Sequence, residues 1–383
     1  MKRKVMMVAG EASGDLHGAS LARELRSLFP KIEIMGMGGA RMAGEGVRLV
    51  AHCSPRSSVV GSVEAWGSLR ALAHSFSSLY RALKKEHPDL LILVDFPDFN
   101  LLLGRLARRR QVPIIYYISP QVWAWRSGRL KTLRRLVDQV LVILPFEEDF
   151  YRKAGMKVHF VGHPLLDQVK PTLSREEVRS RLGVEGGKKL IGLLPGSRLG
   201  ELKRHLPVML RSATLLSKED PSLCFAISQA ETMEEEAMAA FLSGGEGRWR
   251  VWKGRPYDLM NAADLLIVAS GTATLEAGLL GTPMVIVYRL SWLSGVLARI
   301  LIRVEHVGLI NLVLGKEVAP ELLLEKATPE RIAQVVGEFL NDPQRRETIR
   351  QELLSVRSRL GEEGASRRAA LYILQFLQSL SPS

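Results

Sequence analysis

The sequence has only two cysteines, Cys53 and Cys224, in 383 residues. They lie far apart and match neither a disulfide framework nor a metal-ligand spacing, which is typical of a reducing compartment. The segment 1–13 starts with basic residues, but its apolar run is too short for a secretion signal. No segment contains the roughly eighteen uncharged apolar residues of a membrane span. We therefore expect a cytoplasmic protein.

Acidic residues are fewer than basic ones and are missing from two long stretches. The chain carries 53 lysines and arginines against 40 aspartates and glutamates, and this formal net charge of +13 predicts an anionic partner. In the acid-free stretches 99–137 and 277–304, basic residues are mixed with bulky apolar ones. Such a mixture suits an anionic bilayer surface better than a nucleic-acid groove. We predict membrane contact through Trp292, Leu293 and Leu297, and no nucleic-acid partner.

Apolar residues make up 46% of the chain and charged residues 24%, a composition typical of a globular protein. A length of 383 residues favours two domains. Short apolar runs alternate with helical patterns through both halves, from KVMMVA at residues 4–9 to MVIVY at residues 284–288. Continuous apolar runs are typical of parallel strands that are buried on both faces. The sequence thus predicts an α/β protein with two Rossmann-like domains.

We place the first domain at residues 1–165 and the second at residues 186–345. The boundary is expected between about Pro164 and Lys188, where proline, glycine and charged residues become frequent. In this stretch Ser174 is at capping-box spacing from Glu177. Residues 346–383 are predicted to form a helical segment. Its apolar positions need a partner surface, so the segment either crosses back to the first domain or docks on another subunit.

Two loops of the second domain have the composition of an anion-binding site. In open parallel sheets the ligand binds beyond the carboxyl ends of the strands. The run LLIVASGTATLEAG places Ser270, Gly271, Thr272 and Ala273 at such a strand-to-helix turn, where backbone N–H groups and the helix dipole attract an anion. Glu276, one turn into the helix, is placed to accept hydrogen bonds from ribose hydroxyls. As alternatives, Ser270 is an ordinary helix cap and Glu276 is a solvated side chain.

The run LLPGSRLGE brings Gly196, Ser197 and Arg198 to the end of the first strand of the same domain. An arginine fork is well shaped for a diphosphate. The alternative for Arg198 is a surface ion pair with Glu201. Together the two loops favour a nucleotide diphosphate in the second domain. Neither matches a Walker loop or the G-x-G-x-x-G fingerprint, which disfavours ATP hydrolysis and dinucleotide chemistry.

The loops of the first domain carry acids instead. In GEASGDLHG, at residues 10–18, Glu11 and Asp15 would repel a pyrophosphate. Carboxylates do accept hydrogen bonds from sugar hydroxyls, and the glycines allow a ligand to approach the backbone closely. This loop is therefore predicted to bind a polyol or a sugar. A helix N-cap is the alternative role of Asp15.

The run VDFPDFN, at residues 94–100, offers two candidates for a general base. Asp95 ends its strand and faces the expected crevice, where its carboxylate is placed to accept a proton from a hydroxyl group. In the alternative interpretation, Asp95 accepts hydrogen bonds from neighbouring backbone N–H groups. Asp98 follows Pro97 at the start of a helix, where helix capping is its simplest role.

The motifs GEASGD, DFPDFN, SPQVWAWR, LPFE, VGHP, LLPGSR and ASGTATLE occur in this order over nearly the whole chain. With them, the sequence closely resembles the lipid-A-disaccharide synthase family of Gram-negative bacteria. The resemblance implies the GT-B fold, with two domains facing across a cleft, and an inverting transferase that needs no metal or other cofactor. It implies that UDP-2,3-diacylglucosamine is joined to 2,3-diacylglucosamine 1-phosphate, giving UDP and a β-1,6-linked disaccharide. It also implies a peripheral protein of the inner membrane and, in some members, a swapped homodimer.

The resemblance assigns roles to individual residues as well. Asp95 matches the essential aspartate of the family, while Glu11, Ser13 and Asp15 lie on its first glycine-rich loop. With these acceptor-loop residues we group Asp98. The UDP-contacting elements of the family match Ser197, Arg198, Ser270, Gly271, Thr272 and Glu276.

Two other classes of function are left open. One is another UDP-sugar enzyme, such as a peptidoglycan glycosyltransferase or a UDP-sugar 2-epimerase, although the chain shows no clear additional acid and base set for epimerisation. The other is a basic, non-catalytic protein that binds nucleic acid. The sequence also departs from many members of the family at Val60, where they have methionine.

Overall fold

The computed structural model describes residues 3–53, 62–120, 122–123, 128–230, 233, 235–242, 249–289 and 305–380. The predicted membrane contacts Trp292, Leu293 and Leu297, and also Val60, lie outside these ranges. The chain divides into two compact units. Unit 1 contains Met1–Asp167 and Leu360–Ser383, and unit 2 contains Gln168–Arg359. The segment 346–383, which we predicted to be helical, contributes residues to both units.

Unit 1 is built on a seven-stranded parallel sheet. Its strands are β1 (Arg3–Ala9), β2 (Ile32–Gly38), β3 (Arg48–His52), β4 (Leu90–Val94), β5 (Ile114–Tyr117), β6 (Gln139–Val142) and β7 (Val158–Phe160). Their order in the sheet is β3-β2-β1-β4-β5-β6-β7. Because the order reverses between β1 and β4, the loops that follow these two strands are neighbours at the carboxyl edge of the sheet.

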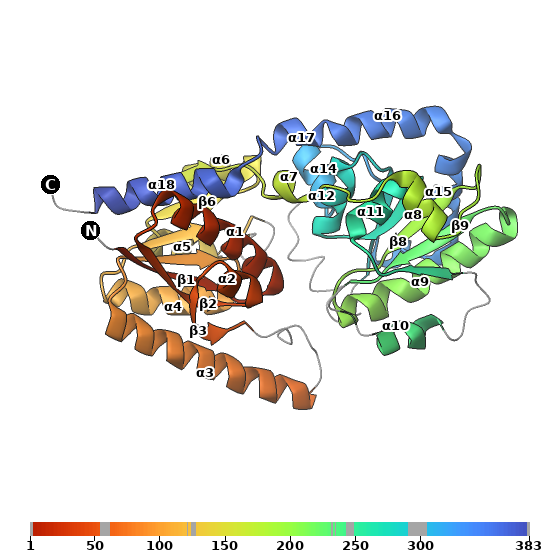
Figure 1. Cartoon of the computed structure of the whole chain (residues 1–383). Coiled ribbons are helices and arrows are strands. Elements are labelled where there is room, and N and C mark those ends of the chain that lie inside the picture. The colour runs from red at the N-terminus through yellow and green to blue at the C-terminus, as the bar shows by residue number, and fades with distance from the viewer. Residues whose placement is uncertain are drawn as a thin grey trace. The chain divides into compact units, whose positions relative to one another are not determined.

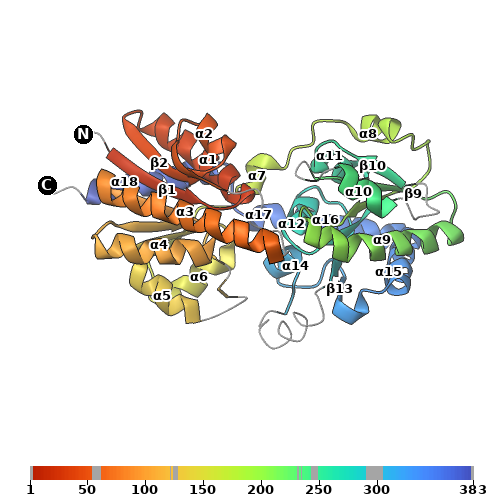
Figure 2. The ribbon, with the colours of Figure 1, turned by 90° about the horizontal axis from the view of Figure 1, so that it is seen from below.

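The helices of unit 1 are α1 (Ala12–Leu28), α2 (Ala40–Gly44), α3 (Ser62–Glu86), α4 (Pro97–Arg109), α5 (Gly128–Leu136), α6 (Pro145–Lys153), α7 (Leu165–Gln168, which ends at the unit boundary) and α18 (Ala365–Ser379). Helices α3, α4 and α5 cover one face of the sheet, and α1 and α18 lie over the other (Figure 1, Figure 2). The guanidinium of Arg3 in β1 donates to the carbonyl of Leu377 at 3.2 Å. The last helix thus crosses back to the first unit and packs there.

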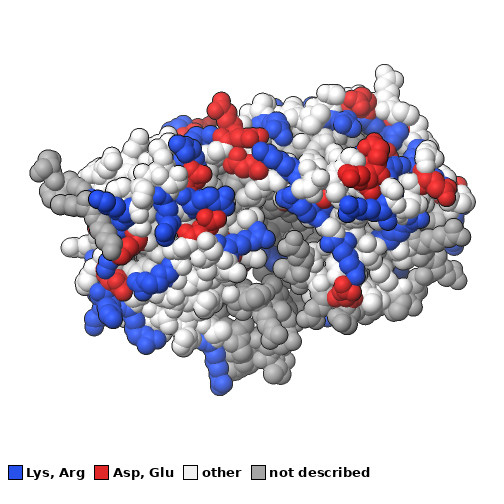
Figure 3. Space-filling model, in the orientation of Figure 1, with Lys and Arg blue, Asp and Glu red and all other residues white. Residues whose placement is uncertain are grey.

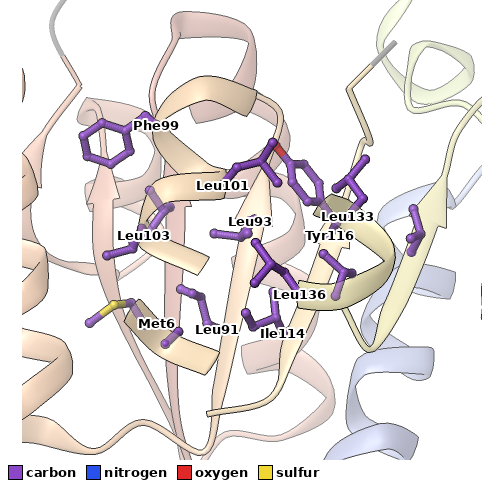
Figure 4. Packing of buried hydrophobic residues seen from close by; sticks show 14 of the residues in the cluster. Met6, Leu91, Leu93, Phe99, Leu101, Leu103, Ile114, Tyr116, Leu133 and Leu136 are labelled. Atoms are coloured by element: carbon purple, nitrogen blue, oxygen red, sulfur yellow. The ribbon is translucent and has the colours of Figure 1, made fainter. Parts of the chain in front are cut away.

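Figure 4 shows how α4 and α5 pack on this sheet. The side chains that meet there come from β1, β4, β5 and the two helices: Met6, Leu91, Leu93, Ile114, Tyr116, Leu101, Leu103, Leu133 and Leu136. Strands β4 and β5 are buried throughout, as their continuous apolar runs predict. Leu79 and Leu83 of α3 are completely buried in the same core.

Unit 2 contains a six-stranded sheet, also parallel throughout. Its strands are β8 (Leu190–Leu194), β9 (Cys224–Ser228), β10 (Trp249–Trp252), β11 (Leu265–Ala269), β12 (Met284–Tyr288) and β13 (Glu321–Leu323), in the order β10-β9-β8-β11-β12-β13. Here the order reverses between β8 and β11. Both sheets therefore have the doubly wound topology expected of Rossmann-like domains, which confirms the predicted fold class.

The helices of unit 2 are α8 (Arg175–Arg181), α9 (Leu199–Glu219), α10 (Glu235–Leu242), α11 (Pro256–Ala262), α12 (Thr272–Leu279), α14 (Leu309–Leu314), α15 (Pro329–Asn341), α16 (Pro343–Leu354) and α17 (Val356–Arg359), with a 3-10 turn at Leu324–Lys326. Helix α9 covers one face of the sheet, while α11 and α12 cover the other (Figure 1). Taken over both units, none of the described helices is long and apolar enough to cross a membrane.

The segment that begins unit 2 is held by local and long-range hydrogen bonds. The hydroxyl of Ser174 accepts the N–H of Glu177 at 3.2 Å, and the Glu177 carboxylate accepts the N–H of Ser174 at 2.9 Å. This confirms the predicted capping box at the start of α8. The carboxylate of Asp258 in α11 accepts the N–H groups of Thr172 and Leu173 at 2.6 and 3.1 Å. These bonds attach the beginning of the unit to helix α11.

Candidate active site

The predicted catalytic and binding residues lie on four loops, two in each unit, or at the beginnings of the helices that follow these loops. In unit 1, Gly10 follows β1 and Asp95 follows β4; in unit 2, Pro195 follows β8 and Ser270 follows β11. Each pair of strands flanks the point where the strand order of its sheet reverses. Open parallel sheets bind their ligands at such points, because the two loops leave in opposite directions. The topology therefore brings the predicted residues of each unit to one place on its sheet.

The backbone around Asp95 lies in the left-handed region. The φ angle is +45° at Asp95 and +47° at Phe96, and it is +57° at Ile118, which follows the neighbouring strand β5. A positive φ is unusual for any residue other than glycine, and most of all for a β-branched one. Such a conformation costs about 1–3 kcal/mol per residue and persists where the surrounding structure enforces it, as it does at active sites.

Three hydrogen bonds hold the main chain of Asp95. Its carbonyl accepts from Nδ2 of Asn100 and from the hydroxyl of Tyr116, both at 2.6 Å. Its N–H donates to the carbonyl of Ile118 at 3.3 Å. Burial and then the charge of Asp95 raise the pKa of Tyr116 well above its usual value, so the phenol keeps its proton as a donor. The backbone that carries the half-buried Asp95 side chain is therefore fixed.

Neither Asn100 nor Tyr116 was predicted to take part in the site. Both side chains are completely buried, and a buried polar group normally has a hydrogen-bond partner. The only sequence signal was a polar residue inside an otherwise apolar pattern, Asn100 at the end of DFPDFN and Tyr116 in the run PIIYYIS. Such a signal shows that a partner is needed but does not show which one.

Asp98 occupies the second position of α4, after Pro97, and its side chain is 80% exposed. It forms an ion pair with Arg129 of α5. The residue at the N-cap position is Phe96, so Asp98 does not cap the helix in the strict sense. An acid in the first turn stabilises a helix through the helix dipole. Asp98 therefore supports the start of α4 by its charge.

The carboxylate of Asp15 binds the N-terminus of another helix. It accepts the N–H groups of Gly39, Arg41 and Met42, at 2.6, 3.2 and 3.1 Å, where α2 begins. With Asp15 only 6% exposed, this carboxylate is used to hold α2 against α1, which differs from the hydroxyl-binding role that we expected. The two other predicted residues of the loop, Glu11 at the N-cap of α1 and Ser13, lie partly or fully at the surface.

The turn after β8 is closed by Glu201. Its carboxylate accepts the N–H of Ser197 at 3.0 Å and that of Arg198 at 3.3 Å, and it lies 3.6 Å from the Arg198 guanidinium. Gly196 has a φ of +114°, and a methyl group there would come within 2.4 Å of the same carboxylate. The alternative predicted for Arg198, an ion pair with Glu201, is therefore present. The N–H groups of this anion-type loop already bind an acid of the same chain.

His205 of α9 connects this turn to the end of β12. Its Nδ1 lies 3.1 Å from the carbonyl of Pro195, and its Nε2 accepts the N–H of Arg289 at 3.3 Å. Both contacts fit a neutral ring with its proton on Nδ1. Burial lowers the pKa of His205, which also favours the neutral ring. His205 was not predicted to take part, because a single histidine on an apolar helix face gives no signal of its partners.

The loop after β11 leaves an open position at the start of α12. Gly271 is the N-cap of this helix, with a φ of +154°, and in the described part of the chain no atom beyond its two neighbouring residues lies within 4 Å of where its Cβ would be. Ser270 does not cap α12, because its hydroxyl donates to the carbonyl of Val307 at 3.0 Å. Thr272 is exposed and Ala273 is half-buried. The first N–H groups of α12 thus follow a glycine that the described residues leave uncovered, as an anion site requires.

Glu276 is neither solvated nor isolated. Its carboxylate accepts the hydroxyl of Tyr257 at 3.1 Å. Burial raises the pKa of Glu276, and the hydrogen bond from Tyr257 lowers it in part. The alternative of a solvated Glu276 is therefore wrong. Among the described residues, no three His, Cys, Asp or Glu side chains gather in a way that could hold a metal ion.

Solved structures with the same fold include a UDP-GlcNAc 2-epimerase and a glycosyltransferase. The UDP-GlcNAc 2-epimerase from Neisseria meningitidis, bound to UDP-GlcNAc, has a TM-score of 0.66 and 13% sequence identity, and the match covers 97% of this chain and 100% of that chain. The calicheamicin glycosyltransferase CalG4 has a TM-score of 0.60 and 16% identity, with full coverage of both chains. At these identities the likeness shows the shared fold alone.

Sequence relatives are much closer. The lipid-A-disaccharide synthase of Syntrophus aciditrophicus is 46% identical over 375 residues, which cover 98% of both proteins. That of Geobacter sulfurreducens is 45% identical over 374 residues, which cover 98% of this chain and 97% of that protein. Residues 5–376 match the family described as Lipid-A-disaccharide synthetase. The chain therefore belongs to the lipid-A-disaccharide synthase family of glycosyltransferases, which confirms the family that its motifs predicted.

Proposed function

We propose that this chain joins UDP-2,3-diacylglucosamine to 2,3-diacylglucosamine 1-phosphate, releasing UDP and forming the β-1,6-linked disaccharide 1-phosphate. The observation that carries this proposal is the strained and hydrogen-bonded backbone at Asp95. It holds a carboxylate at the carboxyl edge of the sheet in unit 1, where an acceptor hydroxyl would need a base. Membership in the family supports the choice of substrates.

In the proposed reaction, the 6-hydroxyl oxygen of the acceptor attacks the anomeric carbon from the face opposite UDP. The new carbon–oxygen bond forms as the bond from the anomeric carbon to the diphosphate oxygen breaks, and UDP leaves with the bonding electrons. The carboxylate of Asp95 takes the proton from the attacking hydroxyl. One displacement of this kind inverts the anomeric centre, which gives the β product from an α-linked donor.

Unit 2 is proposed to bind the UDP portion of the donor. The guanidinium of Arg198 is 48% exposed and its contact with Glu201 is long, at 3.6 Å. Because exposed ion pairs of this kind contribute little, a diphosphate can replace Glu201 as its partner at small cost. The open N-terminus of α12 at Gly271 offers backbone donors to the same anion. Both groups would stabilise the negative charge that develops on departing UDP.

We further propose that the chain works at the surface of the inner membrane, since both substrates carry acyl chains. Helices α4 and α5 carry exposed basic residues, and α4 also carries Leu102, which is 49% exposed. The basic residues are Arg105, Arg108, Arg109, Lys131, Arg134 and Arg135. These helices lie beside α3 on one side of the unit (Figure 2). On the face drawn in Figure 3, by contrast, basic and acidic side chains are interspersed. The basic and apolar composition of the α4–α5 surface therefore suits an anionic bilayer.

A reaction with the two acylated sugars tests the proposed function directly. The purified chain is incubated with both compounds, and the products are separated and weighed by mass spectrometry. We expect UDP and a disaccharide 1-phosphate in equal amounts. An epimerase would instead convert the UDP-sugar alone into an isomer of equal mass and different retention time. Conversion of the donor without consumption of the acceptor would exclude the proposed reaction.

A further inference from the structure

A buried acid outside the residues described so far holds the loop that follows β5. Glu147 is the third residue of α6 and is only 2% exposed. Its carboxylate accepts the hydroxyl of Ser119 at 3.3 Å, the indole N–H of Trp123 at 3.0 Å and the backbone N–H of Leu144 at 3.1 Å. Two of these donors come from the loop and one from the start of α6. Glu147 therefore ties the loop to the helix.

Two neighbours of Glu147 on α6 fix the same loop. The hydroxyl of Tyr151 donates to the carbonyl of Pro120 at 3.1 Å. The rings of Phe146 and Trp123 meet edge to face, with centroids 4.9 Å apart. Side chains of α6 thus form a hydrogen bond with each of Ser119, Pro120 and Trp123, and Trp123 also has an aromatic contact with this helix. A loop held only for stability would not need a buried carboxylate, because neutral acceptors bury at a lower cost.

The held loop begins next to Asp95. Its first residue, Ser119, follows Ile118. The carbonyl of Ile118 accepts the N–H of Asp95, and the N–H of Ile118 donates to the carbonyl of Leu141 at 3.0 Å. Ile118 and Asp95 both have positive φ angles. A shift of Ser119 would therefore be passed to Ile118 and from there to the strained backbone that carries the proposed base.

We propose that Glu147 is a positioning residue, which holds Ser119 and Trp123 so that the loop supports Asp95 and forms the acceptor side of the site. This inference rests on the proposed function. Glu147 does not touch the reacting atoms, and its effect reaches them through Ser119 and Ile118.

Glu147 forms no salt bridge with any residue in the part of the chain that the structure describes. Burial raises its pKa to about 7, against the opposing effect of the hydrogen bonds from Trp123, Leu144, Ser119 and Ile143. Among the described residues, Tyr151 on the same helix is a titratable group that faces it, because burial and then the charge of Glu147 raise the pKa of Tyr151. A protonated carboxyl accepts fewer hydrogen bonds than a carboxylate. Protonation near neutral pH should therefore loosen the contact with Trp123.

A label on tryptophan tests the contact without any substrate. The chain is produced with 5-fluorotryptophan, and the ¹⁹F resonance of residue 123 is assigned as the one that is lost in Trp123→Phe. In the unaltered chain this resonance should shift between pH 5.5 and 8.5, with a midpoint near the raised pKa of Glu147, about 7. In Glu147→Gln the shift should disappear. A resonance that titrates equally in both, or in neither, would overturn the assignment.

Kinetics test the consequence for the acceptor. Glu147→Gln and Trp123→Phe should each lower kcat/KM for the acyl sugar phosphate by about tenfold, the effect of one charge-assisted hydrogen bond. The Kd for UDP should stay within a factor of about two. Glu148→Gln, a change of the neighbouring acid that pairs with Arg152 at the surface, serves as the matched control. An equal loss of UDP affinity, or unchanged acceptor kinetics, would contradict a positioning role. If the proposed reaction itself fails, the fluorine titration still decides whether Glu147 holds the loop.

Discussion

The ring of Phe96 lies against the backbone of Gly10, so that a methyl group at Gly10 would come within 2.1 Å of a ring carbon. The two residues belong to the neighbouring loops after β1 and β4. Phe96 is also in the left-handed region, with a φ of +47°. The loop that carries the proposed base is therefore braced by a glycine from the first motif of the chain.

Gly10→Ala should displace Phe96 and with it Asp95. We expect turnover to fall by at least about tenfold and the free energy of unfolding to fall by about 1–3 kcal/mol, as in other overpacked sites. UDP affinity should be unchanged, because the change lies in unit 1. Gly44→Ala, where a methyl group would meet no atom of the described residues within 4 Å, is the matched control. Turnover and denaturant unfolding check the pair, and wild-type turnover in Gly10→Ala would show that Phe96 does not brace the base.

Asp95→Asn should keep the shape of the side chain and remove the proton acceptor. We expect turnover to fall by at least about 10²-fold, which is typical for the loss of a general base, while UDP binding is preserved. The control is Asp98→Asn, which changes an exposed acid three positions along the same motif. Single-turnover assays and calorimetry with UDP measure the two effects. If Asp98→Asn is the inactive variant, the two acids exchange their proposed roles.

Arg198→Ala should weaken UDP binding by about 1.5–3 kcal/mol, the contribution of a charge-assisted hydrogen bond. The side chain is half exposed and its partner Glu201 also bonds the backbone of the turn, so the fold should tolerate the change. Lys203→Ala, at an exposed position of the same helix, controls for the loss of one positive charge. Calorimetry that finds equal UDP affinity for both variants would reject Arg198 as a diphosphate ligand.

His163 should make stability depend on pH. It is 4% exposed, its Nδ1 accepts the N–H of Leu165 at 3.2 Å, and burial together with the nearby His17 lowers its pKa from 6.5 to about 3. Between these two pKa values the unfolded chain binds one more proton at this site than the folded chain. The free energy of unfolding should therefore fall by up to about 1.4 kcal/mol for each pH unit below 6.5.

In His163→Asn this contribution should be absent, because asparagine offers an acceptor to Leu165 and does not titrate. In urea unfolding below about pH 6.5, stability should fall less steeply with pH than in the unaltered chain, by up to about 1.4 kcal/mol per unit, and the two slopes should converge toward pH 7.5. His74→Asn, on the exposed side of α3, should leave the slope as it is. Equal slopes in all three proteins would mean that His163 is charged in the folded state.

Arg105→Ala combined with Arg109→Ala should reduce binding to vesicles that contain anionic lipid, by up to about 1 kcal/mol for each charge. Added salt should weaken the binding of the unaltered chain, because the attraction is screened. Lys326→Ala combined with Arg350→Ala, both exposed in unit 2, is the matched control. Vesicle co-sedimentation measures the binding. Equal losses in both double variants would indicate a general charge effect and no preferred surface on α4.

A second membrane variant changes Trp292, Leu293 and Leu297 to serine. It should lower vesicle binding and the turnover of long-chain substrates, while short-chain analogues that disperse in water are processed as before. Equal losses on both kinds of substrate would point to a damaged fold. Undiminished vesicle binding would leave the α4–α5 surface as the membrane contact.

The sequence by itself determined the fold class and the positions of the loops. Continuous apolar runs require strands buried on both faces, and helices between them require parallel pairing, so the edge at which Asp95, Gly196 and Ser270 emerge follows from the pattern. Local signals were equally reliable where both partners are close in the chain. The capping box of Ser174 and Glu177 and the pair of Arg198 and Glu201 are of this kind.

Only the tertiary structure decided what each buried polar group binds. Asp15 holds the N-terminus of α2 through Gly39, and Glu147 holds Trp123, over separations of 24 residues each. Asn100 is close to Asp95 in the sequence, but it shares the carbonyl of Asp95 with Tyr116, which comes from the next strand. The amino-acid types show that a carboxylate or an amide needs partners when it is buried. Which donors it meets depends on the order of strands in the sheet, and that order places residues together that no local pattern connects.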